Sequence, residues 1–179
     1  MKAEELLAEY QKGRRDFTAI NLSEASLPGA NLSGVILDRA ILDGADLRQV
    51  DFSQASLVET DLNGANLNQA NLTGANLSGA ILDGAILEEA ILEDANLNQA
   101  DLTIAKLIGA QLRDAELQDA NLNAVSLKEA DLSHANLASS DLSQADLSKA
   151  QLSETNLNQA NLDGANLAGT ILDENKAGE

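Results

Sequence analysis

The sequence predicts an all-β solenoid in which the chain coils around one interior and each coil has four short sides. Three observations predict this fold. Leucine or phenylalanine occurs at every fifth residue from Phe17 to Leu172, thirty-two times without interruption. The position two residues earlier holds alanine or another small or β-branched residue almost throughout. Ten of the twelve glycines fall at one further position of the same five-residue unit.

Neither a regular helix nor a regular strand buries a residue at every fifth position. Five residues of an α-helix turn about 500°, so successive leucines would lie roughly 140° apart. On a strand, an odd spacing would send them to opposite faces. A short extended piece followed by a turn in every unit satisfies the pattern. Four sides of about 90° each close a coil of about 20 residues, which gives about eight coils.

Each position of the unit, counted from its central leucine (i), has a residue type that suits this geometry. Positions i−2 and i share a strand face and point inward, whereas i−1, i+1 and i+2 point outward. A narrow interior explains the small residues at i−2. Glycine at i+2 indicates a turn with positive φ or a close backbone approach. Asn and Asp dominate i−1, where a short polar side chain can hydrogen-bond the local backbone.

The units ANLTG at 70–74 and ADLSK at 145–149 follow the pattern A(D/N)LXX. This pattern resembles the pentapeptide-repeat proteins, and the many Asn-rich units resemble the cyanobacterial members. The resemblance covers residues 16–173. It implies a right-handed quadrilateral parallel β-helix, also called the repeat-five-residue fold. It implies little about activity, because many members of the family have no established function.

The N-terminal segment, residues 1–15, departs from the five-residue pattern. Residues 2–11 are good helix formers, with Leu6, Leu7 and Tyr10 on one face, and Gly13 is a stop signal. We expect a capping helix whose apolar face covers the first coil and protects its edge. Membrane attachment is the alternative for this helix, and its acidic polar face argues against it.

The domain organisation that we expect is a capping segment 1–15, a β-helix 16–173 and a short polar tail 174–179. No second amphipathic segment follows to cover the last coil. Either the acidic tail protects that edge or another chain covers it. By resemblance to family members that dimerise through this end, we expect a homodimer through the C-terminal coil, although the helical segment that some members use is missing.

Several classes of function are excluded by composition. The chain has no cysteine and a single histidine, His134, so we expect no metal site, no cofactor and no thiol catalysis. The glycines are spread singly and form no phosphate-binding loop. Three aromatic residues and a net charge of −18 argue against direct binding of nucleic acid. Paired carboxylates occur, but a convex rod gives them no pocket. We expect no enzyme activity.

The location that we expect is the cytoplasm, without a membrane partner. No run approaches 18 apolar residues, and the N-terminus lacks the hydrophobic region of a signal peptide.

The net charge of −18 is unevenly distributed over the four predicted sides. The second side, with units centred on Leu22 and every twentieth residue after it, carries seven acidic residues and no basic one. The fourth side, from Leu32, carries eight acidic residues against Arg113. The third side, from Leu27, is nearly balanced, with five acidic and four basic residues. We single out the second-side aspartates as candidate interaction residues: Asp43, Asp61, Asp83, Asp101, Asp141 and Asp163.

Two interpretations of this acidity stay open. Duplex DNA carries about 22 charges over roughly 38 Å, the expected length of eight coils, and the charge of −18 is of that order. By resemblance, certain pentapeptide-repeat proteins mimic DNA and bind type II topoisomerases. The simpler interpretation is that acidic residues keep a narrow rod soluble.

A second candidate surface is apolar. Isoleucines occupy outward positions on neighbouring sides of two successive coils and could form a patch that contacts a protein. The alternative is that β-branched residues simply stack well on a pleated surface. The candidate residues are Ile81, Ile86, Ile91, Ile104 and Ile108.

The sequence therefore favours a non-catalytic protein-interaction module with an unidentified protein partner. The principal alternative is an acidic mimic of DNA that regulates a type II topoisomerase or another DNA-binding protein. A passive structural solenoid is the third hypothesis.

Overall fold

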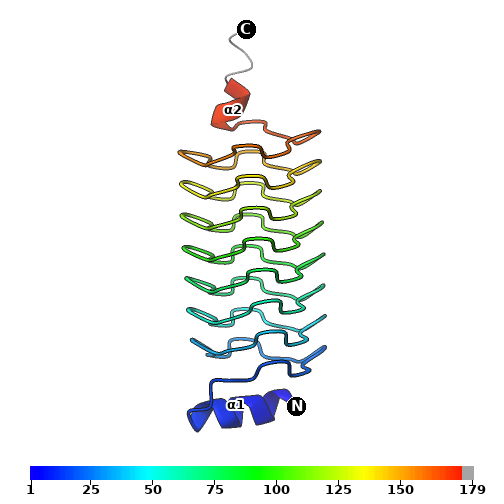
Figure 1. The fold of residues 1–179 in the computed structure, drawn as a ribbon, viewed down its shortest axis with the longest axis vertical. Helices are drawn as coiled ribbons and strands as arrows, with labels where there is room; N and C mark the ends of the chain where they lie inside the picture. Colours follow the sequence, from blue (N-terminus) through cyan, green and yellow to red (C-terminus); the bar gives the residue numbers. More distant parts are fainter. Residues whose placement is uncertain (175–179) are drawn as a thin grey trace.

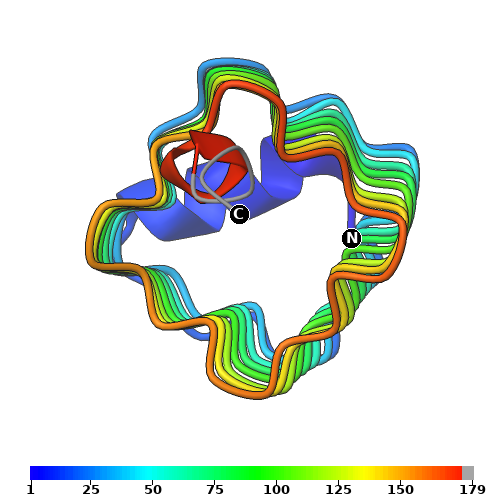
Figure 2. The same ribbon diagram turned by 90° about the horizontal axis from the view of Figure 1, so that it is seen from above.

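The structure, a computed structural model, describes residues 1–174 as a stack of coils with one helix at each end (Figure 1). Helix α1 spans Ala3–Gln11 and helix α2 spans Ile171–Glu174. Between them the chain forms single-residue parallel bridges instead of long strands. Viewed along the stack, successive coils superimpose closely and have four lobes (Figure 2). This is the architecture of the predicted four-sided β-helix.

The register between coils is constant. Every bridge joins two residues that are 20 positions apart, from Asp16 with Ile36 to Asp146 with Asn166. The bridging residue is always at position i−1, so each side of the solenoid carries one column of bridge positions. The predicted coil of 20 residues is confirmed, and with it the assignment of residues to four sides.

Backbone hydrogen bonds join each unit to its neighbours along the stack. Leu42 donates its N–H to the carbonyl of Asp61 at 2.7 Å, and Gly44 donates to Asn63 at 2.8 Å. Inside the turn, the N–H of Ala45 donates to the carbonyl of Leu42 at 3.1 Å. These bonds recur from coil to coil, so the N–H groups at i−2, i−1, i and i+2 of the interior coils are satisfied without long strands.

The third residue of every turn has a left-handed backbone. All turns from Ala19 to Gly169 have positive φ at i+2, which together with the closing hydrogen bond is the pattern of a type II turn. The ten glycines expected there do have positive φ, and so do 21 residues with side chains. A left-handed non-glycine residue costs about 1–2 kcal/mol, and the hydrogen bonds between coils hold these residues in place.

The N–H at position i+1 is satisfied in two ways. Where i−1 is Asn or Asp, its side chain accepts that N–H, as Asp61 does from Asn63 at 3.1 Å. Where i−1 cannot accept, the preceding coil can supply the acceptor, as Asn68 does for the N–H of Glu88 at 3.0 Å. Pro28 stands at i+1 and has no N–H to satisfy, so the only proline fits its turn.

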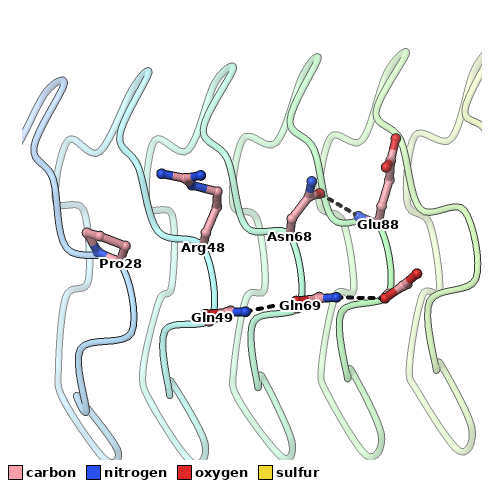
Figure 3. Close-up of a pocket in the computed structure, with 7 residues that line it drawn as sticks. Pro28, Arg48, Gln49, Asn68, Gln69 and Glu88 are labelled. Atoms are coloured by element: carbon pink, nitrogen blue, oxygen red, sulfur yellow. Dashed lines mark hydrogen bonds between the residues drawn. The ribbon is translucent and has the colours of Figure 1, made fainter.

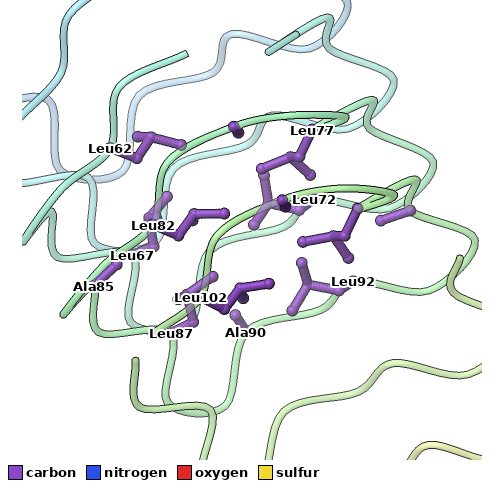
Figure 4. Packing of buried hydrophobic residues seen from close by; sticks show 14 of the residues in the cluster. Leu62, Leu67, Leu72, Leu77, Leu82, Ala85, Leu87, Ala90, Leu92 and Leu102 are labelled. Atoms are coloured by element: carbon purple, nitrogen blue, oxygen red, sulfur yellow. The ribbon is translucent and has the colours of Figure 1, made fainter. Parts of the chain in front are cut away.

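The core is one continuous column of leucine and alanine. Positions i and i−2 are buried along most of the stack, with both Phe17 and Phe52 fully buried among the leucines. Leucines of neighbouring coils pack over one another around the interior (Figure 4). The predicted inward positions are confirmed, and the outward positions i−1, i+1 and i+2 are half-buried or exposed in nearly every unit.

Helix α1 lies against the first coil (Figure 1). Leu6 is fully buried, and the hydroxyl of Tyr10 donates to the carbonyl of Ser33 at 2.7 Å. The guanidinium of Arg15 lies 3.9 Å from the centroid of the Tyr10 ring. The expected helix is present, beginning one residue later than the sequence suggested, with Lys2 as its N-cap residue.

The C-terminal end differs from the expected continuation of the pattern. The last central residue within a coil is Leu167, because Leu172 lies in α2. The hydroxyl of Thr170 accepts the N–H of Leu172 at 3.3 Å, as an N-cap residue does. The stack bridges end at Asn166, so no bridge holds residue 171 in the extended form. Residues 175–179 of the expected tail lie outside the described residues.

Candidate interaction surfaces

The six candidate aspartates occupy two separate columns of the second side. Asp61, Asp101 and Asp141 lie at bridge positions, with one other residue between each pair. The remaining three lie at position i+1 in the turns that follow: Asp43, Asp83 and Asp163. Since neighbouring coils are about 4.8 Å apart, the acidic groups within a column are about 10 Å apart or more. The sequence predicted one acidic side, and the structure divides it into two sparse columns.

The bridge-position aspartates are bound into their own turns. Asp101 accepts the backbone N–H of Thr103 at 3.1 Å and its hydroxyl at 2.6 Å. Asp141 accepts the N–H of Ser143 at 3.0 Å and the side-chain amide of Asn161 at 3.0 Å. Hydrogen bonds from Ser143, then from Asn161, hold the pKa of Asp141 below its usual range. One oxygen of each carboxylate therefore has a structural role.

Two turn-position aspartates have an unusual environment. The Oδ1 atoms of Asp43 and Asp83 are buried and have no hydrogen-bond partner within residues 1–174. Asp163, in the same column, is exposed. No group of three or more potential ligands for a metal ion occurs among the described residues. In both carboxylates the Oδ1 atom is therefore shielded from solvent without a compensating hydrogen bond in the described part of the chain.

The five candidate isoleucines do not form a single patch. Ile81, Ile86 and Ile91 occupy bridge positions on three successive sides and point in different directions. Ile104 and Ile108 lie in the turns on either side of the bridge column that contains Ile86, one coil later. Their exposed fractions are 56% and 36%, and that of Ile81 is 43%. The structure brings Ile86, Ile104 and Ile108 onto one face.

A polar groove that sequence reasoning missed lies along the third side. It measures about 470 Å³ and runs from Pro28 and Arg48 to Glu88 (Figure 3). Along its floor, Gln49 donates to Gln69 at 2.9 Å. The amide of Gln69 in turn donates to the Glu89 carboxylate at 2.8 Å. A recurrence of glutamine 20 residues apart was the sequence signal for this ladder.

The groove offers a chain of satisfied amides instead of a reactive group. Arg48 is paired with Asp46 through two hydrogen bonds of 2.7 Å, which lower the pKa of that carboxyl.

His134, the only histidine, lies 3.4 Å from the carboxylate of Glu154 and is exposed. Within residues 1–174, no helix is long and apolar enough to cross a membrane.

Comparison with known families identifies the repeat. A family model described as "Pentapeptide repeats (8 copies)" matches residues 16–54 and 51–88. A second model, "Pentapeptide repeat region", matches residues 90–167. The chain belongs to the pentapeptide-repeat family. The resemblance read from the A(D/N)LXX units is thereby confirmed, and the family implies a right-handed quadrilateral β-helix.

Solved structures of pentapeptide-repeat proteins are similar to this one. One is a trypsin-treated variant of QnrB1, a plasmid-mediated fluoroquinolone resistance protein. It is 20% identical over 92% of this chain and 89% of its own, with a TM-score of 0.71. HetL of the cyanobacterium Nostoc, involved in heterocyst differentiation regulation, is 35% identical over 95% of this chain and 94% of its own, with a TM-score of 0.42. Rfr23 of the cyanobacterium Cyanothece is 28% identical over 94% and 99%, with a TM-score of 0.32. Among curated proteins, none matches the chain.

Proposed function

We propose that this pentapeptide-repeat protein is a non-catalytic protein-interaction module. The observation that carries the proposal is the gathering of Ile86, Ile104 and Ile108 on one face of a regular stack, with two of them exposed. Apolar side chains that a fold exposes together are typical of a contact surface. Location in the cytoplasm stays a prediction.

The test is binding to a protein partner by the wild type and by surface variants. The double variant Ile104→Asp, Ile108→Asp, immobilised in the same way, is expected not to bind a protein that the immobilised wild type binds. Ile41→Asp is the control, because Ile41 is 38% exposed and lies in the bridge column of Asp61 and Ile81, three coils before the coil of Ile104 and outside this face. Equal binding by both variants would contradict an interaction role for this face.

The two ends support a second element of the proposal. We infer that α1, which buries Leu6 against the first coil, caps the stack. At the other end, Leu157, Leu162 and Leu167 are only partly buried. A second copy that docks on this end would bury them and would give the homodimer through the C-terminal coil. Crosslinking between the C-terminal coils of two copies tests this contact.

A second candidate function is mimicry of DNA. The bridge column favours it, because Asp61, Asp101 and Asp141 repeat negative charge at every second coil along a straight rod. Asp43 and Asp83 add charge at the neighbouring turn position, with their Oδ1 atoms buried. A passive structural solenoid, in which these charges serve only solubility, is the third candidate.

A supercoiling assay with DNA gyrase, with the protein titrated in at two salt concentrations, separates these two candidates. Salt-sensitive inhibition that Asp83→Asn and Asp101→Asn weaken is expected for a mimic of DNA. The control is Asp46→Asn with Asp146→Asn, which removes the same charge from the nearly balanced third side. Absence of inhibition at protein concentrations well above that of the enzyme would remove the hypothesis for gyrase.

A further inference from the structure

Two adjacent rows of side chains on one face of the stack differ in exposure. The more exposed row, which we call the raised row, consists of Ile104, Lys106 and Ile108. The less exposed row, one coil earlier, which we call the recessed row, consists of Gly84, Ile86 and Glu88, and all three are half-buried. We call this surface the Ile86 face. The Ile86–Lys106 bridge fixes the two rows side by side.

The charges of the two rows are opposite and form no ion pair within residues 1–174, and the neighbouring Glu89 carboxylate accepts only the side-chain amide of Gln69. Lys106 forms no ion pair with any residue of the described part, 1–174. Glu88 and Glu89 stand at the turn one coil away and also lack an ion pair among those residues. The raised row therefore presents a cation between two isoleucines, and the recessed row presents carboxylates beside an isoleucine and a glycine.

A two-fold axis that runs between the two rows, at right angles to the stack, makes this face complementary to itself. Two copies related by that axis lie antiparallel, and the raised row of each faces the recessed row of the other. Ile104 of one copy then meets the Gly84 turn of the second, where the Cδ1 atom of that copy's own Ile104 lies 4.0 Å from the place that a Cβ of Gly84 would take, so the two Ile104 side chains come together. Lys106 meets Ile86 and reaches the carboxylate of Glu88. Both contacts occur twice by symmetry.

The overall charge of −18 opposes association of two copies, so the choice of side matters. The second and fourth sides carry a net charge of about −7 each, which excludes them as surfaces for a second copy. Ile86, Glu88, Lys106 and Ile108 belong to the third side, which is nearly balanced, and the uncharged residues Gly84 and Ile104 stand at the corner that it shares with the second side. Its acidic residues are Asp46, Glu88, Glu89, Glu129 and Asp146, and its basic residues are Arg48, Lys106, Lys128 and Lys149.

The next rows outward are compatible with the same arrangement. Asn66 lies one coil before Ile86, and Ser126 one coil after Lys106. The two-fold axis brings Asn66 of one copy opposite Ser126 of the second, and both are small, uncharged residues. The apolar centre thus has a polar margin, as protein interfaces generally have.

We propose that the Ile86 face binds a second copy of this chain, antiparallel and side by side, with Lys106 of each copy on Glu88 and Glu89 of the other. The proposal deepens the interaction role assigned above to this face and rests on it. It differs from the end-to-end contact through the C-terminal coil. Because the contact spans only a few coils, we expect a weak dimer with a dissociation constant in the micromolar range.

The chain has no cysteine, so the geometry can be tested by crosslinking of single-cysteine variants. Asn66→Cys and Ser126→Cys face one another across the axis. A short bis-maleimide is expected to join the two variants when they are mixed and to join neither variant to itself. Crosslinking of Asn66→Cys alone would overturn the antiparallel arrangement. No crosslink in the mixture, at concentrations where sedimentation shows a dimer, would also overturn it.

Charge reversal provides the second test. Lys106→Glu and the double variant Glu88→Lys, Glu89→Lys are each expected to weaken self-association at least about tenfold, as measured by sedimentation equilibrium. A mixture of the two is expected to recover it, because every Lys then meets a Glu. Variants that had merely lost their fold would give no recovery in the mixture, and their far-ultraviolet circular dichroism would change.

The outcomes separate this proposal from the broader interaction role. A wild type that stays monomeric up to about 100 μM, or a dimer that Lys106→Glu leaves unchanged, overturns the proposal. If the wild type is monomeric and Ile104→Asp, Ile108→Asp abolishes the binding of a different protein, the interaction role stands and the face is assigned to that protein. If the wild type is monomeric and the double variant still binds every partner of the wild type, both proposals are overturned.

Discussion

The two ends of the stack are built differently, although the repeats between them are nearly uniform. At the N-terminal end, α1 contributes the fully buried Leu6, and Phe17 of the first coil is also fully buried. At the C-terminal end, the leucines of the last coil are only partly buried. The four-residue α2 provides no comparable side chain, since Leu172 is half-buried.

The backbone shows the same difference. In the interior coils, each central residue donates its N–H to the following coil. The last coil has no following coil, and no backbone bond from the N–H groups of Leu157 or Leu162 is present within the described part of the chain. The comparison teaches that a repeat depends on its neighbours, so that identical units have different stabilities in different places.

The largest expected effect is at the closed end. Leu6→Asp places a carboxylate in the buried site between α1 and the first coil, and it is expected to lower the free energy of unfolding by about 3–5 kcal/mol. Urea unfolding measures the loss, and amide hydrogen exchange is expected to rise first in residues 17–32. Ala8→Asp is the control, because Ala8 is exposed on the same helix. Equal loss in both variants would show that α1 contributes nothing as a cap.

The second prediction compares the same substitution in the middle and at the open end. Leu87 is fully buried, so Leu87→Ala is expected to cost about 2–5 kcal/mol. Leu157 in the last coil is only half-buried, so its side chain loses less buried area than that of Leu87. Leu157→Ala is therefore expected to cost about 1 kcal/mol or less. The midpoints of urea unfolding check this ranking. Similar costs would mean that the open end is covered in solution, as a dimer through that end requires.

A third, smaller effect concerns the left-handed turn residues. Ala19 at the closed end has φ of 57°, so Ala19→Gly is expected to stabilise the protein by about 0.5–1 kcal/mol. Ala138 stands at i+1 without positive φ, and Ala138→Gly is expected to destabilise instead. Gln159→Gly is expected to gain less than Ala19→Gly, because the last coil opens before the rest. Thermal unfolding of the three variants tests the order.

The smallest effect is the pH dependence of the open end. Asp141 and Asp146 accept side-chain amides of Asn161 and Asn166 in the last coil, both at 3.0 Å. Hydrogen bonds lower the pKa of both carboxyls in the folded state, chiefly those from Ser143 for Asp141 and from Ser148 for Asp146.

The sign of that pH dependence follows from linkage. Groups with a lowered folded pKa contribute their stability above the unfolded pKa of about 3.9, and that contribution is lost as pH falls through the folded value. Amide exchange of residues 156–167, compared with that of the Asp141→Asn, Asp146→Asn variant, is expected to show a few-fold difference that disappears in acid. A difference that grows in acid would contradict this assignment.

The interior of the fold could be predicted from the sequence because its rule is strict. A leucine at i and a small residue at i−2 leave one arrangement that buries both, and Phe17 and Phe52 obey it. The 20-residue register followed from four sides of equal length. Glycine at i+2 correctly indicated positive φ, as at Gly44 and Gly84.

The surface could not be predicted to the same degree, because outward positions tolerate many residue types. Glycine alone signals a left-handed turn in sequence, so the same conformation at Gln69 and Glu129 went unseen. The pairing between coils was equally hidden. Asn98 accepts the N–H of Gln118 at 2.7 Å because Glu116, at the bridge position, does not accept it.

The candidate site was predicted in part. The sequence grouped the aspartates and isoleucines by side, and the structure separates them by column. Asp101 is hydrogen-bonded to its turn, whereas Asp83 has a buried oxygen without a hydrogen-bond partner among residues 1–174. Their assignment to an interaction surface is a proposal. The α2 turn was missed, since residues 171–174 continue the repeat pattern in sequence and lack only the bridge that would hold it.

The constant 20-residue bridge register makes surface and interior respond differently to insertions. A duplication of 20 residues would lengthen the rod by one coil, about 4.8 Å, and would keep every later residue on its own side. A duplication of five residues would preserve the leucine pattern of the core and turn all later columns by a quarter of the circumference. The core therefore tolerates insertions in multiples of five residues, whereas a surface motif stays on its side only when the insertion is a multiple of twenty. A functional surface thus restricts the length of an insertion more tightly than folding does.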